Sequence, residues 1–480
     1  MKTLGWRLWH SPTFTTWGSL GVRLASVVLL LPFVLVRFSP EEVAVWQLIT
    51  ALFMLGLILD YALAPTFTRL MSYARAGLAP AQMGKLLPGA GRGAVDTAAA
   101  DASMVAVFGT MRWLYPRLAV LVLALLSTLG TWGLVTPINH LSHPAAAWLA
   151  WCIVLISFYV ALWGGCYSAA LQGMDSIAPV RRWEIAFGAV QVSNCLVVLW
   201  LGGGLLQLIA TYQVWTVIGV LRNRFLLSRL HPALTAAPRR PDPAVLDAAR
   251  SPAWRSLAGV LFSQGVIQFS GIYYAQTLPA AEVASYLLGL RLIMIVSQFS
   301  QAPFYTKLPN MAQLHAAGQP AAVLRAAASG MRRAHWVFAA GAVLAALVSP
   351  WMLGLVHSRT AFLPAPTFAL LALAFWFERL GAMHIQLYSL TNHVLWHIAN
   401  GVTGLSMCLI TVVLVPVLGL MAFPLAMALS YLGFYCPFAL IHSRRAFVPK
   451  LWRFERGVSV GPLALLLFGL GAGQLLPLAH

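Results

Sequence analysis

Long apolar stretches fill most of this chain and restrict the kind of fold it can adopt. A helix needs roughly 20 apolar residues to cross about 30 Å of hydrocarbon. Backbone polar groups in lipid must be satisfied within the protein, and apolar runs of this length satisfy them as helices. The sequence therefore predicts an all-α polytopic membrane protein. We expect thirteen spans, at residues 14–36, 43–65, 113–136, 145–169, 185–201, 203–221, 257–278, 283–304, 335–356, 364–389, 396–415, 418–441 and 458–479.

Composition supports this class. Of the 480 residues, 60% are hydrophobic and only 9% are charged, with a mean hydropathy of +0.80. One soluble core would not hide so much apolar surface. The five cysteines lie in apolar runs without the spacing of a metal site, so we interpret them as small core residues.

The sequence contains an internal repeat. SPEEVAVW at 39–46 and APTFTRL at 64–70 return as PAAEVASY at 279–286 and APFYTKL at 302–308. The offset between the copies hardly changes: Glu42 and Glu282 are 240 residues apart, and Pro65 and Pro303 are 238 residues apart. Duplicated halves are common in secondary transporters, where the substrate path runs between them. The repeat predicts two pseudo-symmetric six-helix lobes and one extra C-terminal helix.

Domain boundaries follow from this duplication and from a proline-broken stretch, PRRPDPAV, between the halves. We expect an N-terminal lobe at 1–235, a cytoplasmic linker at 236–256 and a C-terminal lobe at 257–442. Residues 443–480 form a basic segment followed by the additional span.

The basic residues indicate an orientation. With a cytoplasmic N-terminus, most of the 31 Lys and Arg residues fall on the inner side, and only Arg37 and Arg359 fall outside. This distribution obeys the positive-inside rule. The charge follows alternate short loops and not one face of a soluble domain, so it does not indicate nucleic-acid binding.

At this point the motifs resemble a known family. Ser39-Pro40-Glu41-Glu42 after the first span, LILDYALAPTFTRLMSYARAG at 57–77, six-plus-six spans and a basic inner connector are similar to one superfamily, the multidrug/oligosaccharidyl-lipid/polysaccharide (MOP) flippases. Within it, the chain resembles the polysaccharide-transport (Wzx-like) branch over about residues 12–442.

The resemblance implies a function. Two six-helix lobes would enclose a central cavity that opens alternately to each side. The cargo would be an undecaprenyl-diphosphate-linked oligosaccharide, moved to the periplasmic leaflet of the bacterial inner membrane. Expected partners are the lipid bilayer, the lipid-linked oligosaccharide and other membrane proteins of polysaccharide assembly.

Three arginines fall within the expected spans. A charged side chain at mid-membrane needs a partner, water or a function, and guanidinium groups match phosphate oxygens well. We therefore expect Arg23 and Arg291, and also Arg379, to contact the diphosphate. The alternative is structural pairing, of Arg23 with Asp60 or of Arg379 with Glu378, although adjacent residues on a helix do not face each other.

Two acids are candidates for ion coupling, with Na⁺ or H⁺ as the coupling ion and no other cofactor. Glu378 is the better candidate because it alone lies at mid-membrane depth. Asp60 is also a candidate, but we favour its being an interfacial acid beside Arg69 and Arg75.

Neutral polar residues are candidates for the sugar path. Gln264 and Gln268 share a helix face at i, i+4, although such amides also bond neighbouring helices. His393 and His397 have the same spacing, but a zinc site needs more ligands than these two, so we expect no metal. Glu42 and Glu282 recur at helix starts, where negative charge complements the helix dipole.

Two other functions remain open. A multidrug or small-cation exporter of the same superfamily would have a more acidic cavity. A membrane polysaccharide polymerase or ligase would need reactive groups in sizeable outer loops, and this sequence has only short ones. It also has no paired-carboxylate, HExxH or P-loop motif, so we expect a transporter and not an enzyme.

Overall fold

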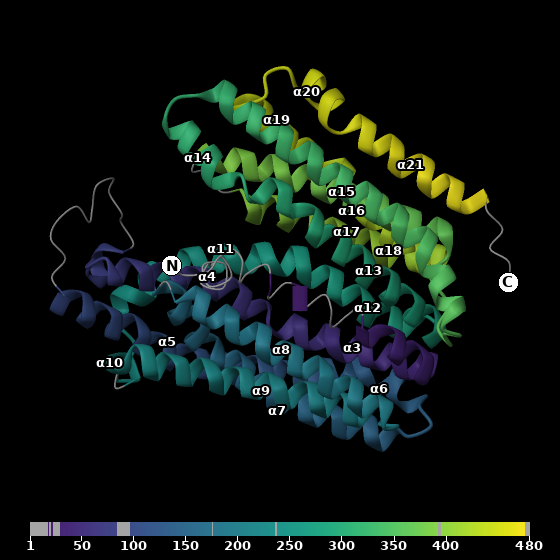
Figure 1. Cartoon of the computed structure of the whole chain (residues 1–480), viewed down its shortest axis with the longest axis horizontal. Helices are drawn as coiled ribbons and strands as arrows, with labels where there is room; N and C mark the ends of the chain where they lie inside the picture. The colour runs from purple at the N-terminus through teal and green to yellow at the C-terminus, as the bar shows by residue number, and fades with distance from the viewer. Residues whose placement is uncertain are drawn as a thin grey trace, which may run out of the picture. The chain divides into compact units, whose positions relative to one another are not determined.

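The protein is helical throughout the part that the structure describes. This structure is a computed structural model, and it describes residues 18, 21–22, 29–83, 97–174, 176–235, 238–391 and 395–475 (Figure 1). Within these ranges the regular elements are helices and no strand occurs. The expected all-α class is therefore confirmed.

The chain divides into two compact units, residues 1–260 and 261–480. The first unit has its core among α4, α5 and α7, where Phe67, Met111 and Tyr115 are fully buried. Its elements are α3 (Pro40–Gly56), α4 (Ile58–Arg75), η1 (Pro80–Gln82), α5 (Thr97–Leu125), η2 (Leu126–Gly130), α6 (Thr131–Asn139), α7 (Pro144–Gly173), α8 (Ile177–Trp200), α9 (Leu205–Leu230), α10 (Pro232–Thr235) and α11 (Pro243–Val260).

The second unit has a core cluster that joins α14, α15 and α16 to the turn after α19, through residues such as Met331, Met383 and Val448. Its elements are η3 (Leu261–Gly265), α12 (Val266–Thr277), α13 (Ala280–Tyr305), α14 (Leu308–Ala316), α15 (Pro320–Leu355), α16 (Ala365–Tyr388), η4 (Ser389–Thr391), α17 (Trp396–Leu418), η5 (Gly419–Met421), α18 (Ala422–Ser430), η6 (Tyr431–Tyr435), α19 (Cys436–Ala446), α20 (Leu451–Val458) and α21 (Val460–Leu475).

The helices are suited to a membrane. Among the described residues, nine helical segments are long and apolar enough to cross one, or ten if the bent pair α20–α21 is one span. Large apolar side chains lie exposed on them, such as Ile156, Val417 and Phe468, and a surface of this kind suits lipid contact. The chain is thus built as a multi-pass membrane protein.

The count of thirteen spans is not confirmed. The expected span 14–36 lies largely outside the described residues, and 257–278 combines the end of α11 with η3 and α12. The run 396–446 qualifies as one segment, yet its helices α17 and α18 pack against each other after the turn at Gly419.

Several helices are longer than the spans expected for them. At 36 residues, α15 is about 54 Å long, well beyond the hydrocarbon thickness. Its first turns occupy much of the connection between the expected spans 283–304 and 335–356, and α5 and α11 likewise begin well before the expected spans 113–136 and 257–278. An α-helix satisfies its own backbone hydrogen bonds outside the bilayer as well as inside it. The extent of the apolar run therefore does not set where these helices begin and end.

The first motif of each repeat begins a helix, α3 in one copy and α13 in the other. Ser39 caps α3, its hydroxyl accepting from the Glu42 amide at 3.3 Å while the Glu42 carboxylate accepts from the Ser39 amide at 3.0 Å. Glu282 lies in the first turn of α13. The structural role expected for Glu42 is confirmed, since this arrangement is a capping box.

Much of the expected linker is helical. α11 begins at Pro243, and the Asp242 carboxylate accepts hydrogen bonds from the amides of Ala244 and Val245. The helix then packs against α4 of the first unit. The prolines of this stretch therefore mark a helix start, where proline is well tolerated.

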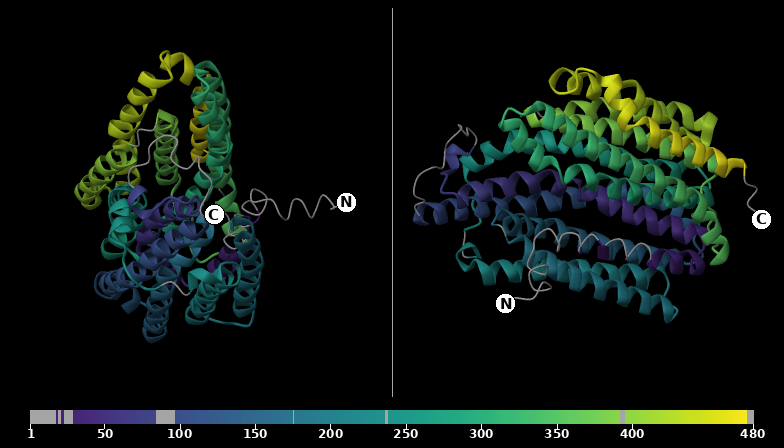
Figure 2. Two further views of the ribbon diagram at one scale, coloured as in Figure 1. Left: turned by 90° about the vertical axis from the view of Figure 1, so that its left-hand side faces the viewer. Right: turned by 45° about the horizontal axis from the view of Figure 1, so that its top comes forward.

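The C-terminal helices belong to the second unit. Both α20 and α21 pack against α15, and α21 also contacts α16. They follow each other at an angle of 49°. Figure 2 shows this pair in yellow along the green helices of the unit.

Candidate functional site

Arg379 lies in the core of the second unit. Its side chain, on α16, is 1% exposed, and its guanidinium donates a hydrogen bond to the hydroxyl of Ser297 on α13. It also lies 3.3 Å from the Glu378 carboxylate. A buried guanidinium needs such compensation, because an isolated charge in this environment is costly.

Glu378 and Arg379 contact each other although adjacent residues on a helix do not normally face each other. Glu378 Oε2 contacts the guanidinium but has no hydrogen bond among the described residues, and Arg379 Nε has none there either. The contact is therefore electrostatic and poorly aligned. Glu378 is about a quarter exposed, so one side of this pair is accessible while Arg379 is not.

Asp60 forms the second polar site, in the first unit, where its side chain is half-buried and its Oδ1 is buried. It lies in the first turn of α4, against Gly165 of α7 and Tyr115 of α5. A Cβ added at Gly165 would lie 2.3 Å from Asp60 Oδ1 and 2.8 Å from the Tyr115 ring. The absent side chain at Gly165 thus makes room for the carboxyl group.

Asp60 does not lie beside Arg69 and Arg75, as the interfacial interpretation from the sequence expected. Helix rise places Arg75 about 22 Å and Arg69 about 13 Å further along α4, and Arg75 instead donates to the carbonyl of Met174. Asp60 forms no ion pair within the described parts of the chain, where its Oδ1 also lacks a well-aligned hydrogen bond. A carboxyl group in such a place is suited to holding a proton or a cation.

The other expected site residues are scattered. Arg291 is half-buried on α13, six residues before Ser297. Gln264 is exposed in the π-helical turn η3 and Gln268 is half-buried in α12, so the two differ in environment. Arg23 and His393 lie outside the described residues.

The second unit also contains a buried polar network that the sequence did not predict. The Glu455 carboxylate lies 2.8 Å from Nε2 of the fully buried His384 and accepts from the Ser459 hydroxyl at 2.5 Å. Ser459 also contacts His335 Nδ1 at 3.2 Å, and His384 Nδ1 lies 2.9 Å from Ser443. These residues come from distant parts of the sequence, and the only available signal was a single acid in a basic segment.

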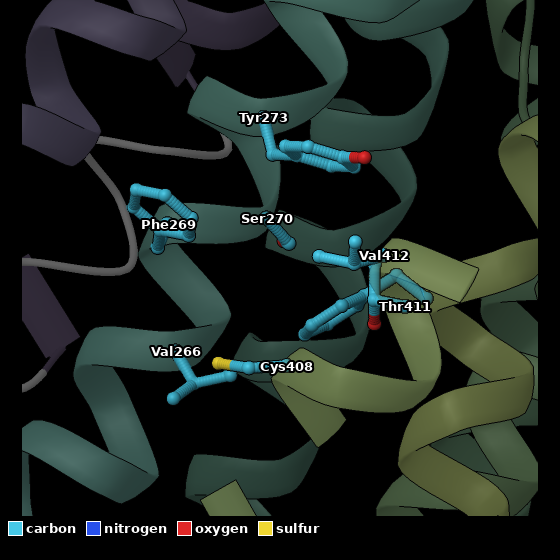
Figure 3. A pocket seen from close by; sticks show the side chains of 8 residues that line it. Val266, Phe269, Ser270, Tyr273, Cys408, Thr411 and Val412 are labelled. Carbon is cyan, nitrogen blue, oxygen red and sulfur yellow. The ribbon is translucent and has the colours of Figure 1, made fainter. Parts of the chain in front are cut away.

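A small pocket lies between α12 and α17 (Figure 3). Val266, Phe269 and Tyr273 line it from α12, while Cys408 and Val412 do so from α17. Its volume of about 40 Å³ leaves space for a few water molecules. Ligand sites for drug-sized molecules have volumes of roughly 300–1,000 Å³, so this pocket is too small for either expected cargo.

Comparison with known proteins relates the fold to one group of transporters. No family model and no curated protein matches the sequence. An inward-facing multidrug-resistance MATE family transporter of the MOP superfamily is 13% identical with a TM-score of 0.65, over 91% of this chain and 95% of that one.

Two further structures agree with this likeness. A MATE protein in a bent conformation is 12% identical with a TM-score of 0.57, over 96% of this chain and all of the other. An outward-facing MATE family transporter is also 12% identical, with a TM-score of 0.56, over 95% of this chain and all of the other. At this identity the likeness concerns the fold, and this chain therefore shares the helical fold of the MATE transporters of the MOP superfamily.

Proposed function

We propose that this protein is an ion-coupled secondary transporter that moves an amphiphilic cargo across the membrane by alternating access. The observation that carries the proposal is the half-buried Asp60, whose Oδ1 is buried and which forms no ion pair within the described residues. Acids inside membrane spans commonly belong to ion or proton pathways. Fold similarity alone would not suffice, because one fold hosts many functions.

The first candidate cargo is a small amphiphilic organic cation. The solved proteins of similar fold are named as multidrug-resistance transporters. In the second unit, the charge of Arg379 is already compensated by Glu378 and Ser297. A buried and compensated guanidinium is a poor binder of an incoming phosphate, so the structure supports the exporter more than the sequence did.

The second candidate cargo is a lipid-linked oligosaccharide. It is supported by the sequence resemblance and by Arg291, a half-buried guanidinium in a membrane-spanning helix. Binding of a diphosphate by Arg23, Arg291 and Arg379, and of sugars by Gln264 and Gln268, remains a prediction. In this case the protein would act with other membrane proteins of polysaccharide assembly in the bacterial inner membrane.

We assign ion coupling first to Asp60 and second to Glu378. This order reverses the one favoured by the sequence, because Glu378 contacts Arg379 whereas Asp60 has no cationic partner in the described structure. The coupling ion would be H⁺ or Na⁺. Neither carboxyl group is proposed to react covalently with the cargo, so the proposed role is that of a transporter and not an enzyme.

Reconstitution tests the proposal. Protein in liposomes is given a pH or Na⁺ gradient and either a fluorescent organic cation or a fluorescent diphosphate-linked oligosaccharide. We expect gradient-driven transport of one of the two, and Asp60→Asn should abolish the dependence on the gradient while preserving insertion. Glu282→Gln, an exposed acid at a helix start, is the matched control. Failure to transport either probe under either gradient would contradict the proposal.

A further inference from the structure

Helix α20 has two faces of opposite chemistry. Leu451, Phe454 and Val458 pack into the core cluster of the second unit, and Val458 is 3% exposed. On the other face, Trp452 is 77% exposed and Arg453 and Arg456 are exposed as well. The helix therefore lies on the unit by its apolar face and presents an aromatic ring and two cations outward.

The buried network fixes which face points outward. Glu455 turns into the unit, where His384 and Ser459 hold its carboxylate. The Phe454 ring also lies edge-on to the His384 ring, 6.1 Å away. Rolling α20 about its axis would take Glu455 away and leave His384 Nε2 without its acceptor in a buried place, which is unfavourable.

This arrangement separates charge. Residues 444–456 contain five cations, and all of them are exposed: Arg444, Arg445, Lys450, Arg453 and Arg456. The single acid of the segment is Glu455, which is turned inward. None of the five cations forms an ion pair with another described residue, so no acid of the described structure compensates their charge.

The neighbouring helix suggests where this face lies. α21 is apolar, and α20 joins it at 49°. A short amphipathic helix with Trp and Arg outward, bent away from an apolar helix, is typical of the membrane interface. Exposed cations at that level meet the phosphate groups of the lipids.

We propose that the outward face of α20, together with the end of α19, is a binding site for anionic phospholipid headgroups such as phosphatidylglycerol. The cations contact phosphate, and Trp452 lies at headgroup depth. An acidic segment of a soluble protein is the competing occupant. The exposed Trp452 favours lipid, because indole rings prefer the interface between water and hydrocarbon.

Lipid retention by the full-length protein tests this site. Purified protein is mixed with detergent micelles that contain equal phosphatidylglycerol and phosphatidylcholine, and the bound lipids are counted by native mass spectrometry. We expect at least a roughly tenfold preference for phosphatidylglycerol. The variant Lys450→Gln/Arg453→Gln/Arg456→Gln should lose most of it.

The matched control removes the same charge elsewhere. Arg239→Gln/Arg240→Gln/Arg250→Gln changes three exposed arginines of the first unit and should retain the preference. Equal losses in both variants, or a wild type that does not discriminate between the lipids, would overturn the proposal, and the second result would leave the face to an acidic protein. If the first variant does not fold, high salt applied to the wild type must still remove the preference, since exposed charges are screened.

Discussion

The Asp60 carboxyl group lies where a side chain at position 165 would be, so this position requires glycine. A Cβ at Gly165 would overlap Asp60 Oδ1, so Gly165→Ala should destabilise the protein by about 1–3 kcal/mol, the usual cost of overpacking. Gly219→Ala, on α9 with open space around it, is the control and should be neutral or stabilising by about 0.5–1 kcal/mol. Thermal unfolding in detergent measures both, and equal midpoints would show that the carboxyl group moves aside freely.

Glu455 connects the C-terminal helices to the rest of the second unit. Its side chain is 13% exposed, and Glu455→Ala would leave His384 Nε2 without its acceptor and remove that of Ser459. Leaving a buried donor unsatisfied typically costs about 1–3 kcal/mol. The exposed Glu282→Ala should cost no more than about 0.3–1 kcal/mol, the value of an acid at a helix start. Chemical unfolding that gave both variants similar losses would contradict a stabilising role for the network.

At this scale the sequence identified individual residues but not their partners. Asp60, Glu378 and Arg379 were recognisable because charge inside an apolar stretch is rare and costly. Tyr115, Gly165 and Ser297 are ordinary residues in spans, and only the packing of the helices brings them to the charged groups. The neighbours expected for Asp60, Arg69 and Arg75, were wrong for the same reason, since its actual neighbours come from α5 and α7.

The start of α3 shows how a local motif acts on a whole element. Ser39→Ala removes the acceptor for the Glu42 amide and should cost about 0.5–2 kcal/mol. Hydrogen exchange should therefore accelerate at the Glu42 amide and the rest of the first turn. Glu42→Gln keeps an acceptor in the capping box and should leave exchange nearly unchanged. Unaltered exchange in the Ser39 variant would mean that tertiary contacts alone hold this end.

Helix class was easier to predict than helix ends. Runs of apolar residues identify membrane helices, whereas α15 begins well before its apolar run, with Arg325, Arg332 and Arg333 in its first turns. Each repeat begins a helix with its first motif, yet the first copy breaks at Leu57 between α3 and α4 while α13 continues to Tyr305. The two similar sequences are thus interrupted at different positions of their helices, and side-chain packing determines these positions.

The orientation of the whole molecule follows from the distribution of basic residues and can be measured directly. Positive charge gathers on the connections expected to face the cytoplasm. After replacement of the native cysteines, we introduce single cysteines at two exposed positions, Ser142→Cys between α6 and α7 and Pro449→Cys before α20. A membrane-impermeant maleimide should label the first in intact cells and the second only after the cells are opened.

These two positions separate the alternatives because they fall on opposite sides of the expected topology. Labelling of Pro449→Cys alone in intact cells would invert the orientation and would place the cations of α20 on the outer face. Labelling of both in intact cells would place the two positions on the same side of the membrane. An even number of crossings would then separate them, whereas the apolar runs predict an odd number. The expected pattern would place α20 at the cytoplasmic leaflet, where anionic lipids attract Lys and Arg, and so would support its proposed lipid site independently of the cargo.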